Sequence, residues 1–256
     1  MSGLGSTADL AAVGAWWIAS IGVCWLTGVP WIVANVLVLG VPLAYLLHRS
    51  AGVRAALRWT FVGKYVAFVT VFFNYLCVRF GGWGGDSVLP TVAGVNVEQV
   101  SWTFLFIALA IACNEAFFVG PGARRTRRYP RTILTIMFFG GFVIALTPPL
   151  RELMSGHVYL KVGIGLYPIA LLLALTVNVR VIPELVRIMV LFGALNLPFE
   201  LLALEHDYWT FPGEYIGWVD IAGYRFPVEE LVFLVLLCAP AVVATYSLYK
   251  NWKGLH

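Results

Sequence analysis

The chain has 256 residues, of which 61% are hydrophobic and 12% are charged, and its formal net charge is +4 at pH 7. Roughly a quarter of the residues of a soluble domain are charged, so this composition excludes a soluble globular protein. Unbroken apolar runs of about twenty residues favour membrane-spanning helices, because a transmembrane barrel would show alternating segments of about ten residues. The sequence predicts an all-α integral membrane protein, with one membrane domain over residues 1–256.

Eight apolar runs follow one another along the chain, and each predicts a transmembrane helix. They cover residues 10–26, 29–48, 57–78, 100–120, 131–149, 158–179, 183–204 and 229–249. The first run has no basic region before it, so we interpret it as a helix rather than as a cleavable signal peptide. The cysteines stand singly inside apolar runs, which is typical of small buried residues rather than of a metal site or a disulfide. They are Cys24, Cys77, Cys113 and Cys238.

The basic residues predict the orientation of these helices. They gather after the second, fourth, sixth and eighth helices, and the loop after the fourth contains GARRTRRYPR with five arginines. Eight helices place all four basic segments on one side of the membrane, which the positive-inside rule makes cytoplasmic. Both termini are therefore expected in the cytoplasm of a bacterial-type cell membrane. The same rule accounts for the RRTRR run, so we expect the bilayer and not a nucleic acid as partner.

Two parts of the chain share one order of features, which suggests an internal repeat. Residues 29–120 and 158–249 each hold two helices, a Trp-bearing loop and a third helix that opens with an acidic residue. Both copies start on the same side of the membrane, so they would be parallel repeats of three helices, with the first and fifth helices as additions. The aligned pairs are Asn74 with Glu200, Trp83 with Trp209, Glu98 with Glu229, Gln99 with Glu230 and Trp102 with Phe233.

The acidic residues are concentrated in one stretch. The chain has 13 of them, and seven lie between residues 197 and 233. An ionisable residue inside a bilayer costs at least about 2.5 kcal/mol, so each is a functional candidate. Glu200 ends one helix and Glu229 and Glu230 begin the next on the same side of the membrane, so the three carboxyl groups can converge. A helix cap or a polar lock between helices remains the simpler interpretation for any one of them.

This arrangement favours acid catalysis in an apolar pocket. Buried carboxyl groups beside other carboxyl groups have raised pKa values, and a partly protonated carboxyl group can act as a general acid. Each nearby aromatic face stabilises a cation by about 0.5–2 kcal/mol, although an interfacial aromatic belt would also place Trp and Tyr here. The combination suits protonation of an alkene in a lipophilic polyene, ring closure through a carbocation and loss of a proton.

The sequence offers two sets of candidate site residues. The candidate catalytic residues are Glu200, Asp207, Glu229 and Glu230. The candidate substrate-binding residues are Asn74, Trp83, Glu115, Asn196, Tyr208, Trp209, Phe211, Trp218 and Phe233. Glu98, Asp86 and Glu115 are alternatives for the base that removes the final proton. Nucleotide loops, metal-binding motifs such as HExxH and the Asp-rich motifs of diphosphate-dependent enzymes are missing from the sequence, so we expect no cofactor and no metal.

The stretch LPFELLALEHDYWTFPGEYIGWVDIAGYRFPVEELVF resembles the lycopene cyclase domain, a small helical type found as two-subunit enzymes in actinobacteria and as fused forms in archaea and fungi. The shared residues are Glu200, Trp209, Phe211, Gly223, Pro227, Glu229, Glu230 and Phe233. The resemblance implies redox-neutral cyclisation of the ends of an acyclic carotenoid, and it implies that Glu229 and Glu230 carry the proton transfer.

The first copy departs from this pattern, since VNVEQ replaces Pro-x-Glu-Glu and Asn74 replaces an acid. One intact site suggests a relative that acts on one end of an asymmetric lipid, and membrane-embedded meroterpenoid cyclases are similar in size and helix count. The expected partners are thus a lipophilic isoprenoid substrate and the bilayer, with a homo-oligomer as a further option. A transporter and a non-catalytic subunit of a cyclase complex are the alternative functions.

Overall fold

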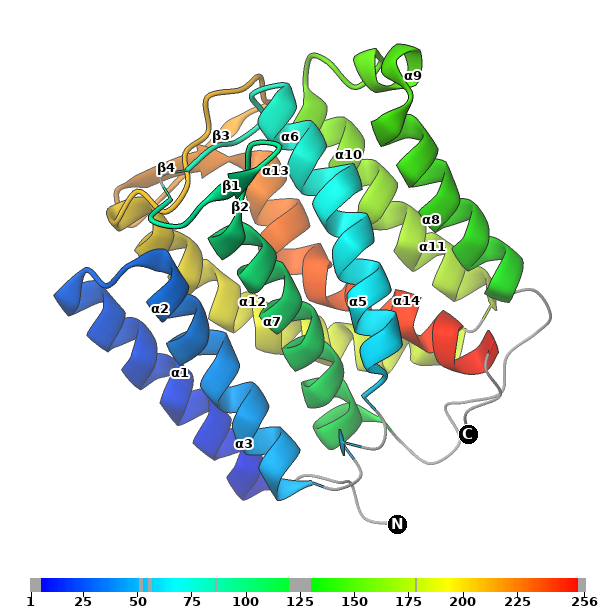
Figure 1. The fold of residues 1–256 in the computed structure, drawn as a ribbon. Helices are drawn as coiled ribbons and strands as arrows, with labels where there is room; N and C mark the ends of the chain where they lie inside the picture. Colours follow the sequence, from blue (N-terminus) through cyan, green and yellow to red (C-terminus); the bar gives the residue numbers. More distant parts are fainter. Residues whose placement is uncertain are drawn as a thin grey trace.

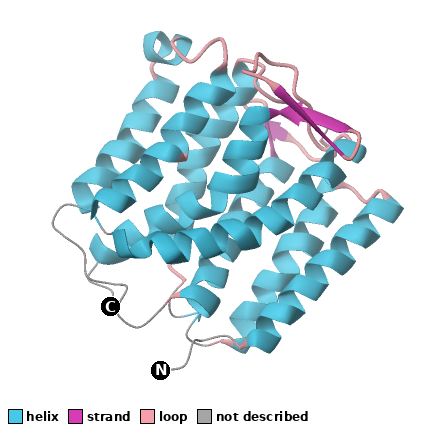
Figure 2. Cartoon of the chain, turned by 180° about the vertical axis from the view of Figure 1, so that it is seen from behind, coloured by secondary structure: helices cyan, strands magenta, loops and turns pink. Residues whose placement is uncertain are grey.

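The computed structural model of the chain describes residues 6–50, 53–54, 57–85, 87–119, 130–177 and 179–252. They form a bundle of long helices that run side by side, with two small hairpins at one end (Figure 1). The view from behind places the strands at the same end (Figure 2). The described start of α1 (Thr7–Thr27) and the described end of α14 (Cys238–Trp252) lie at the opposite end of the bundle.

The helices and strands follow the order expected from the apolar runs. The remaining helices are α2 (Trp31–Asn35), α3 (Val41–Arg49), α5 (Trp59–Val69), α6 (Tyr75–Arg79), α7 (Val97–Cys113), α8 (Pro130–Leu146), α9 (Pro148–Glu152), α10 (Val158–Leu166), α11 (Pro168–Val177), α12 (Ile182–Glu205) and α13 (Val228–Glu230). Wider π-helical turns interrupt them at η1 (Val36–Gly40), η2 (Thr70–Asn74), η3 (Asn114–Phe118) and η5 (Leu231–Leu237), and η4 (Val179–Val181) is a short 3₁₀ turn. The strands are β1 (Thr91–Val92), β2 (Val95–Asn96), β3 (Trp218–Ile221) and β4 (Tyr224–Pro227).

Seven helical stretches of the described chain are long and apolar enough to cross a membrane. They are Thr7–Thr27, Trp31–Arg49, Trp59–Arg79, Val97–Phe118, Val158–Val177, Val179–Glu205 and Val228–Lys250. These stretches match seven of the predicted spans to within a few residues, so the prediction of a helical membrane protein is confirmed at this level. The remaining predicted span, the fifth in chain order over residues 131–149, forms the shorter helix α8, whose apolar described part is Leu134–Leu146. About twenty residues are needed to cross the hydrocarbon core, so the count of eight transmembrane helices is not confirmed.

Local signals explain where the helices begin and end. Ser6 and Asp9 form a capping box at the start of α1, in which each side chain accepts a hydrogen bond from the other residue's backbone N–H. Gly28 ends the same helix with φ of +60°, a conformation that glycine adopts without strain. The predicted span 158–179 is broken after Tyr167, because Pro168 supplies no N–H to continue the helix.

The α7 and α14 helices form the centre of the bundle. Helix α7 packs against α2, α3 and α5, helix α14 packs against α8, α11 and α12, and the two also contact each other. Their spans are 67% and 72% buried within the protein, whereas the span of α1 is 22% buried. The acidic residues at the start of these two spans, Glu98 and the pair Glu229 and Glu230, are buried in the interior.

The two hairpins are built alike. Strands β1 and β2 pair antiparallel and lead into α7, and strands β3 and β4 pair antiparallel and lead into α13. Both turns consist of an Ala-Gly pair with positive φ, at Ala93–Gly94 and Ala222–Gly223, as two-residue type I′ turns require. This shared local structure supports the repeat, which stays a prediction.

The loops before the hairpins are joined to each other. Gly84 and Thr210 exchange two backbone hydrogen bonds, with N···O distances of 3.0 and 2.8 Å. Gly85 fits closely against the second loop, because a Cβ built on it would lie 2.1 Å from the carbonyl oxygen of Tyr208. This contact requires glycine for close approach and not for its φ angle.

We expect Gly85→Ala to destabilise the protein by about 1–3 kcal/mol, since a backbone carbonyl cannot move away as a flexible side chain can. The measurement is the midpoint of thermal unfolding of the purified protein in detergent. Gly63→Ala is the matched control, because no atom lies within 4 Å of its added Cβ and alanine favours a helix by about 1 kcal/mol over glycine. Equal midpoints for the two variants would contradict the close approach of the loops.

Candidate functional site

A narrow pocket lies between the central helices, and both halves of the chain line it. Its volume is about 40 Å³, which is room for about three water molecules. Eight of its 18 lining residues are aromatic, namely Trp31, Tyr65, Phe73, Trp83, Trp102, Phe106, Tyr167 and Trp209. Asn74, Gln99, Thr103 and Glu230 supply its polar groups. Among the described lining residues, Glu230 contributes the one carboxyl group.

Glu230 lines this pocket and interacts with Glu200. Both are almost fully buried, and no donor of the described residues reaches Oε2 of Glu200. The indole Nε1 of Trp209 donates to Oε1 of Glu200 over 3.0 Å. The hydroxyl of Tyr159 donates to Oε2 of Glu230. The predicted convergence of Glu200 with the acids that open the last helix is therefore correct for Glu230.

The π-helical turns η2 and η5 lie beside this site. Asn74 is the last residue of η2, and η5 follows directly after Glu230. In η5 the carbonyl oxygen of Leu234 accepts a hydrogen bond of 3.0 Å from Nδ2 of Asn196. Wider turns of this kind are frequent at functional sites, because they change which side chains face the interior.

Glu229 makes different contacts from its neighbour Glu230. It is buried, its Oε1 accepts a hydrogen bond of 2.8 Å from the backbone N–H of Ile216, and it is not among the lining residues of the pocket. Glu98, its predicted counterpart, accepts from the backbone N–H groups of Val88 and Leu89, both over 2.9 Å. Both carboxylates therefore hold the loop that precedes their own hairpin.

A second group of polar lining residues carries no acid. Asn74 donates from Nδ2 to the hydroxyl of Thr103 over 3.3 Å, and that hydroxyl donates to the carbonyl oxygen of Gln99 over 2.9 Å. Asn74 and Gln99 are the residues that the sequence aligns with Glu200 and Glu230. The structure thus brings Asn74, Gln99 and Glu230 into the lining of one pocket, with Glu200 in contact with Glu230.

Three tryptophans surround the indole of Trp209, which binds Glu200. The ring of Trp209 lies 5.4 Å from that of Trp31, 6.1 Å from that of Trp83 and 6.5 Å from that of Trp102, all edge to face. The predicted sites Trp83 and Trp209 are both part of the lining. Edge-to-face packing of this kind holds the rings in defined orientations.

Several other predicted site residues lie outside the pocket. Asp207 is exposed in the turn after α12, with φ of +53°, and the structure does not bring it to the carboxyl pair. Trp218 is 41% exposed and stacks under the guanidinium group of Arg225. Phe211 packs edge to face on Tyr215 in the loop. None of these three residues is among the described lining residues of the pocket.

The remaining predicted residues are buried but face other groups. Tyr208 donates to the carbonyl oxygen of Val29 over 2.5 Å, and burial raises the pKa of its hydroxyl to about 12. Phe233 stacks on Tyr167 with ring centroids 5.8 Å apart, so it supports the lining from behind. Asn196 donates its hydrogen bond to the carbonyl oxygen of Leu234 in η5, as described above. None of the three is among the described lining residues.

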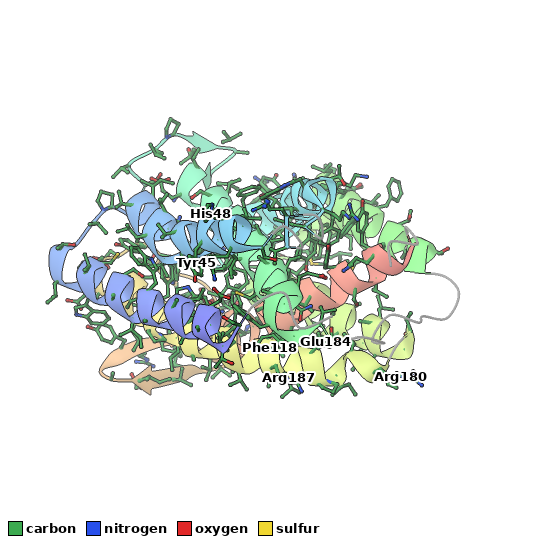
Figure 3. The ribbon with its side chains drawn as sticks, turned by 90° about the horizontal axis from the view of Figure 1, so that it is seen from below. Tyr45, His48, Phe118, Arg180, Glu184 and Arg187 are labelled. Atoms are coloured by element: carbon green, nitrogen blue, oxygen red, sulfur yellow. The ribbon has the colours of Figure 1, made fainter. Side chains whose placement is uncertain are left out.

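Glu115 belongs to the other end of the bundle. It is buried, and its Oε1 lies 2.6 Å from Nζ of Lys250. Nearby, η3 contacts α12, and the view from below shows Phe118 of η3 beside Glu184 of α12 (Figure 3). Glu115 is thus part of an ion pair far from the hairpins. Asp86, an alternative for the base, lies outside the described residues.

Sequence reasoning missed part of the site. Trp31, Gln99, Trp102 and Tyr159 each contact the carboxyl pair or line the pocket, yet none was a candidate. The alignment of the two halves carried a signal for two of them, because Gln99 and Trp102 stand opposite Glu230 and Phe233. Tyr159 and Trp31 lie at the starts of long apolar helices, where nothing in the local sequence marks them.

Comparison of the chain with known protein families, with curated proteins and with solved structures gives no significant match. The resemblance to lycopene cyclase domains therefore stays a hypothesis that rests on the motif. In the part of the chain that the structure describes, no group of three or more His, Cys, Asp and Glu side chains could hold a metal ion.

Proposed function

We propose that the chain is a membrane-embedded, redox-neutral terpene cyclase that starts ring closure by protonating an alkene of a lipophilic polyene. The observation that carries this proposal is the contact between Glu200 and Glu230 at the wall of an aromatic pocket. An aromatic pocket alone could bind many lipids, and a carboxyl pair alone could lock two helices. Their combination supplies an acid where a carbocation would be stabilised.

The carboxyl pair is suited to hold a proton. Two carboxyl groups in contact and away from water do not both ionise at low cost, because like charges repel and burial removes their hydration. Glu230 faces the pocket, whereas Glu200 accepts from the indole of Trp209 behind it. Glu230 is therefore the acid, and Glu200 and Tyr159 position it and compensate for its charge after the proton has left.

The reaction balances without an oxidant or a reductant. The proton of Glu230 forms a C–H bond with one alkene carbon, and the second alkene carbon becomes a cation. The electron pair of another alkene in the same chain then forms a C–C bond to that cation, and the charge moves along. Loss of a proton from a neighbouring carbon restores a double bond, and the carboxyl pair regains its proton by exchange with solvent before the next turnover. The product is an isomer of the substrate.

The aromatic side chains of the pocket lining can stabilise the carbocation. Each aromatic face near a desolvated cation contributes about 0.5–2 kcal/mol, and the lining provides eight aromatic side chains. The pocket is much smaller than the roughly 300–1,000 Å³ of a typical ligand site, so side chains must move apart when a chain end enters. We assign one end of a long isoprenoid to this pocket, with the rest of its chain among the helices or in the lipid.

The basic end of the bundle faces the cytoplasm in this proposal. His48 lies in the last turn of α3, Arg180 lies in η4, and Arg187 lies near the start of α12; Figure 3 labels all three in the view from below. Positive charge marks the cytoplasmic side of helical membrane proteins. The carboxyl pair then lies toward the non-cytoplasmic face, beneath the two joined loops.

The test is to express the chain in a bacterial strain that accumulates lycopene and in a strain that is supplied with a farnesylated indole. The expected result is a new compound of unchanged mass from one of these substrates, separated by chromatography with mass detection. Lycopene conversion would support a carotenoid cyclase, and indole conversion a cyclase of prenylated compounds. Recovery of both substrates without an isomer, from a strain in which the chain is folded in the membrane, would contradict the proposal for these two classes.

A further inference from the structure

We infer that the pocket binds a polyene whose reacting end carries a hydrogen-bond acceptor, such as a carbonyl, ether or epoxide oxygen or a ring nitrogen, and not a pure hydrocarbon. The inference rests on the proposed function for the polyene itself. The new element is that the substrate carries a polar acceptor group, and that named donors in the pocket lining bind this group.

The observation is a set of buried donors without acceptors. Nε1 of Trp31, Nε1 of Trp83 and Nε2 of Gln99 are buried, and none of them has a hydrogen-bond partner among the described residues. All three residues line the pocket. A ligand that fills this pocket without offering an acceptor would leave three buried donors unpaired, which is unfavourable.

Two further donors of the lining have partners. The indole N–H of Trp209 is bound to Glu200, and the amide of Asn74 is bound to Thr103. The three unpaired donors belong to α2, to the loop before β1 and to α7, which are all in the first half of the chain. The acid comes from α13 in the second half. The first half of the chain therefore gives the pocket its unpaired donors, and the second half gives it the acid.

These donors define what a ligand must offer. An indole N–H can only donate, so Trp31 and Trp83 require an acceptor in any ligand that pairs with them. A hydrocarbon end would enter the pocket and leave all three N–H groups unpaired. An end with an acceptor oxygen or nitrogen would pair with at least one of them, while its alkene lies toward Glu230.

The same asymmetry fits the amide that the first half carries at residue 99. A substrate with two identical ends is served by two equivalent acids, whereas Gln99 stands where the second half has Glu230. An amide at this position offers an N–H to the ligand and no proton to an alkene. The lining residues of the first half then bind the polar group of the ligand, and Glu230 of the second half protonates its alkene.

The binding test uses two saturated ligands that cannot cyclise. One is the isoprenoid methyl ketone phytone, and the other is the branched hydrocarbon pristane, in which a methyl-bearing carbon replaces the carbonyl. Each is titrated into the purified protein in detergent, and the rise of the thermal unfolding midpoint with ligand concentration gives its affinity. We expect phytone to bind about tenfold more tightly than pristane, as one additional hydrogen bond to a buried donor implies.

Three variants locate the effect. Trp83→Phe and Gln99→Leu each remove one unpaired donor, and we expect each to reduce the preference for the ketone at least about threefold. Trp17→Phe is the matched control, because Nε1 of Trp17 is also buried without a partner but Trp17 does not line the pocket. It should leave the preference unchanged.

Equal affinities of the wild-type protein for phytone and pristane would overturn the inference, and so would a preference that survives in both Trp83→Phe and Gln99→Leu. These results are independent of catalysis. A preference for the ketone without any isomerisation would support the inference and count against the cyclase. Isomerisation together with equal affinities would support the cyclase and overturn the inference.

Discussion

Replacement of Glu230 by Gln is expected to lower the rate of ring closure by about 10²–10⁴-fold, the usual contribution of a positioned general acid. The amide retains the shape of the side chain and can still accept from the hydroxyl of Tyr159. It cannot release a proton to an alkene. The measurement is the first-order rate of product formation by purified protein in liposomes, together with the thermal unfolding midpoint, which should change little.

Glu229→Gln is the matched control for this prediction, because the two carboxylates are neighbours on one helix. Its amide oxygen can still accept from the N–H of Ile216, so we expect less than about tenfold loss of rate. Glu200→Gln should lie between the two, since Glu200 touches Glu230 but does not line the pocket. Full activity of Glu230→Gln, or equal losses in Glu229→Gln and Glu230→Gln, would contradict the assignment of the acid.

Replacement of Lys250 by Met is expected to destabilise the protein by about 3–5 kcal/mol. The Lys250 and Glu115 side chains are 12% and 3% exposed, and the N···O distance between them is 2.6 Å. Removal of the ammonium group leaves the Glu115 carboxylate buried without this cation. The measurement is the free energy of unfolding in mixed micelles with increasing denaturing detergent.

Two further variants distinguish this effect from a general loss of packing. The double variant Glu115→Gln/Lys250→Met should recover part of the lost stability, because it removes both charges together. Lys161→Met should cost at most about 1 kcal/mol, since Lys161 is exposed and its ammonium group contacts backbone carbonyl oxygens only. A double variant that is less stable than Lys250→Met would contradict a buried ion pair.

The membrane spans could be predicted from the sequence because apolar runs and their basic flanks are local features. Seven predicted spans agree with described helices, and the break after Tyr167 and the short α8 are the differences. The break depends on Pro168, which a window of mean hydropathy does not register. For α8, Pro148 begins a separate short helix, so the apolar run is divided there.

The candidate site was predicted in part. The convergence of Glu200 and Glu230 follows from two helix ends on one side of the membrane, which topology alone specifies. The separation of Glu229 from Glu230 could not be predicted, because neighbouring residues in a first helical turn point in different directions that depend on the hairpin before them. Asp207 was a candidate because of its charge, yet the turn after α12 leaves it exposed.

The most direct test of the central claim is to run the reaction of the purified protein, in liposomes made in D₂O and without added cofactor, on the substrate class identified in cells. If the carboxyl pair supplies the proton that starts ring closure, the product is a ring isomer of the substrate that carries one deuterium on the carbon that was protonated. The Glu230→Gln protein should give no such product. A cyclic product without deuterium, or a product that appears only when a redox cofactor is added, would contradict the account.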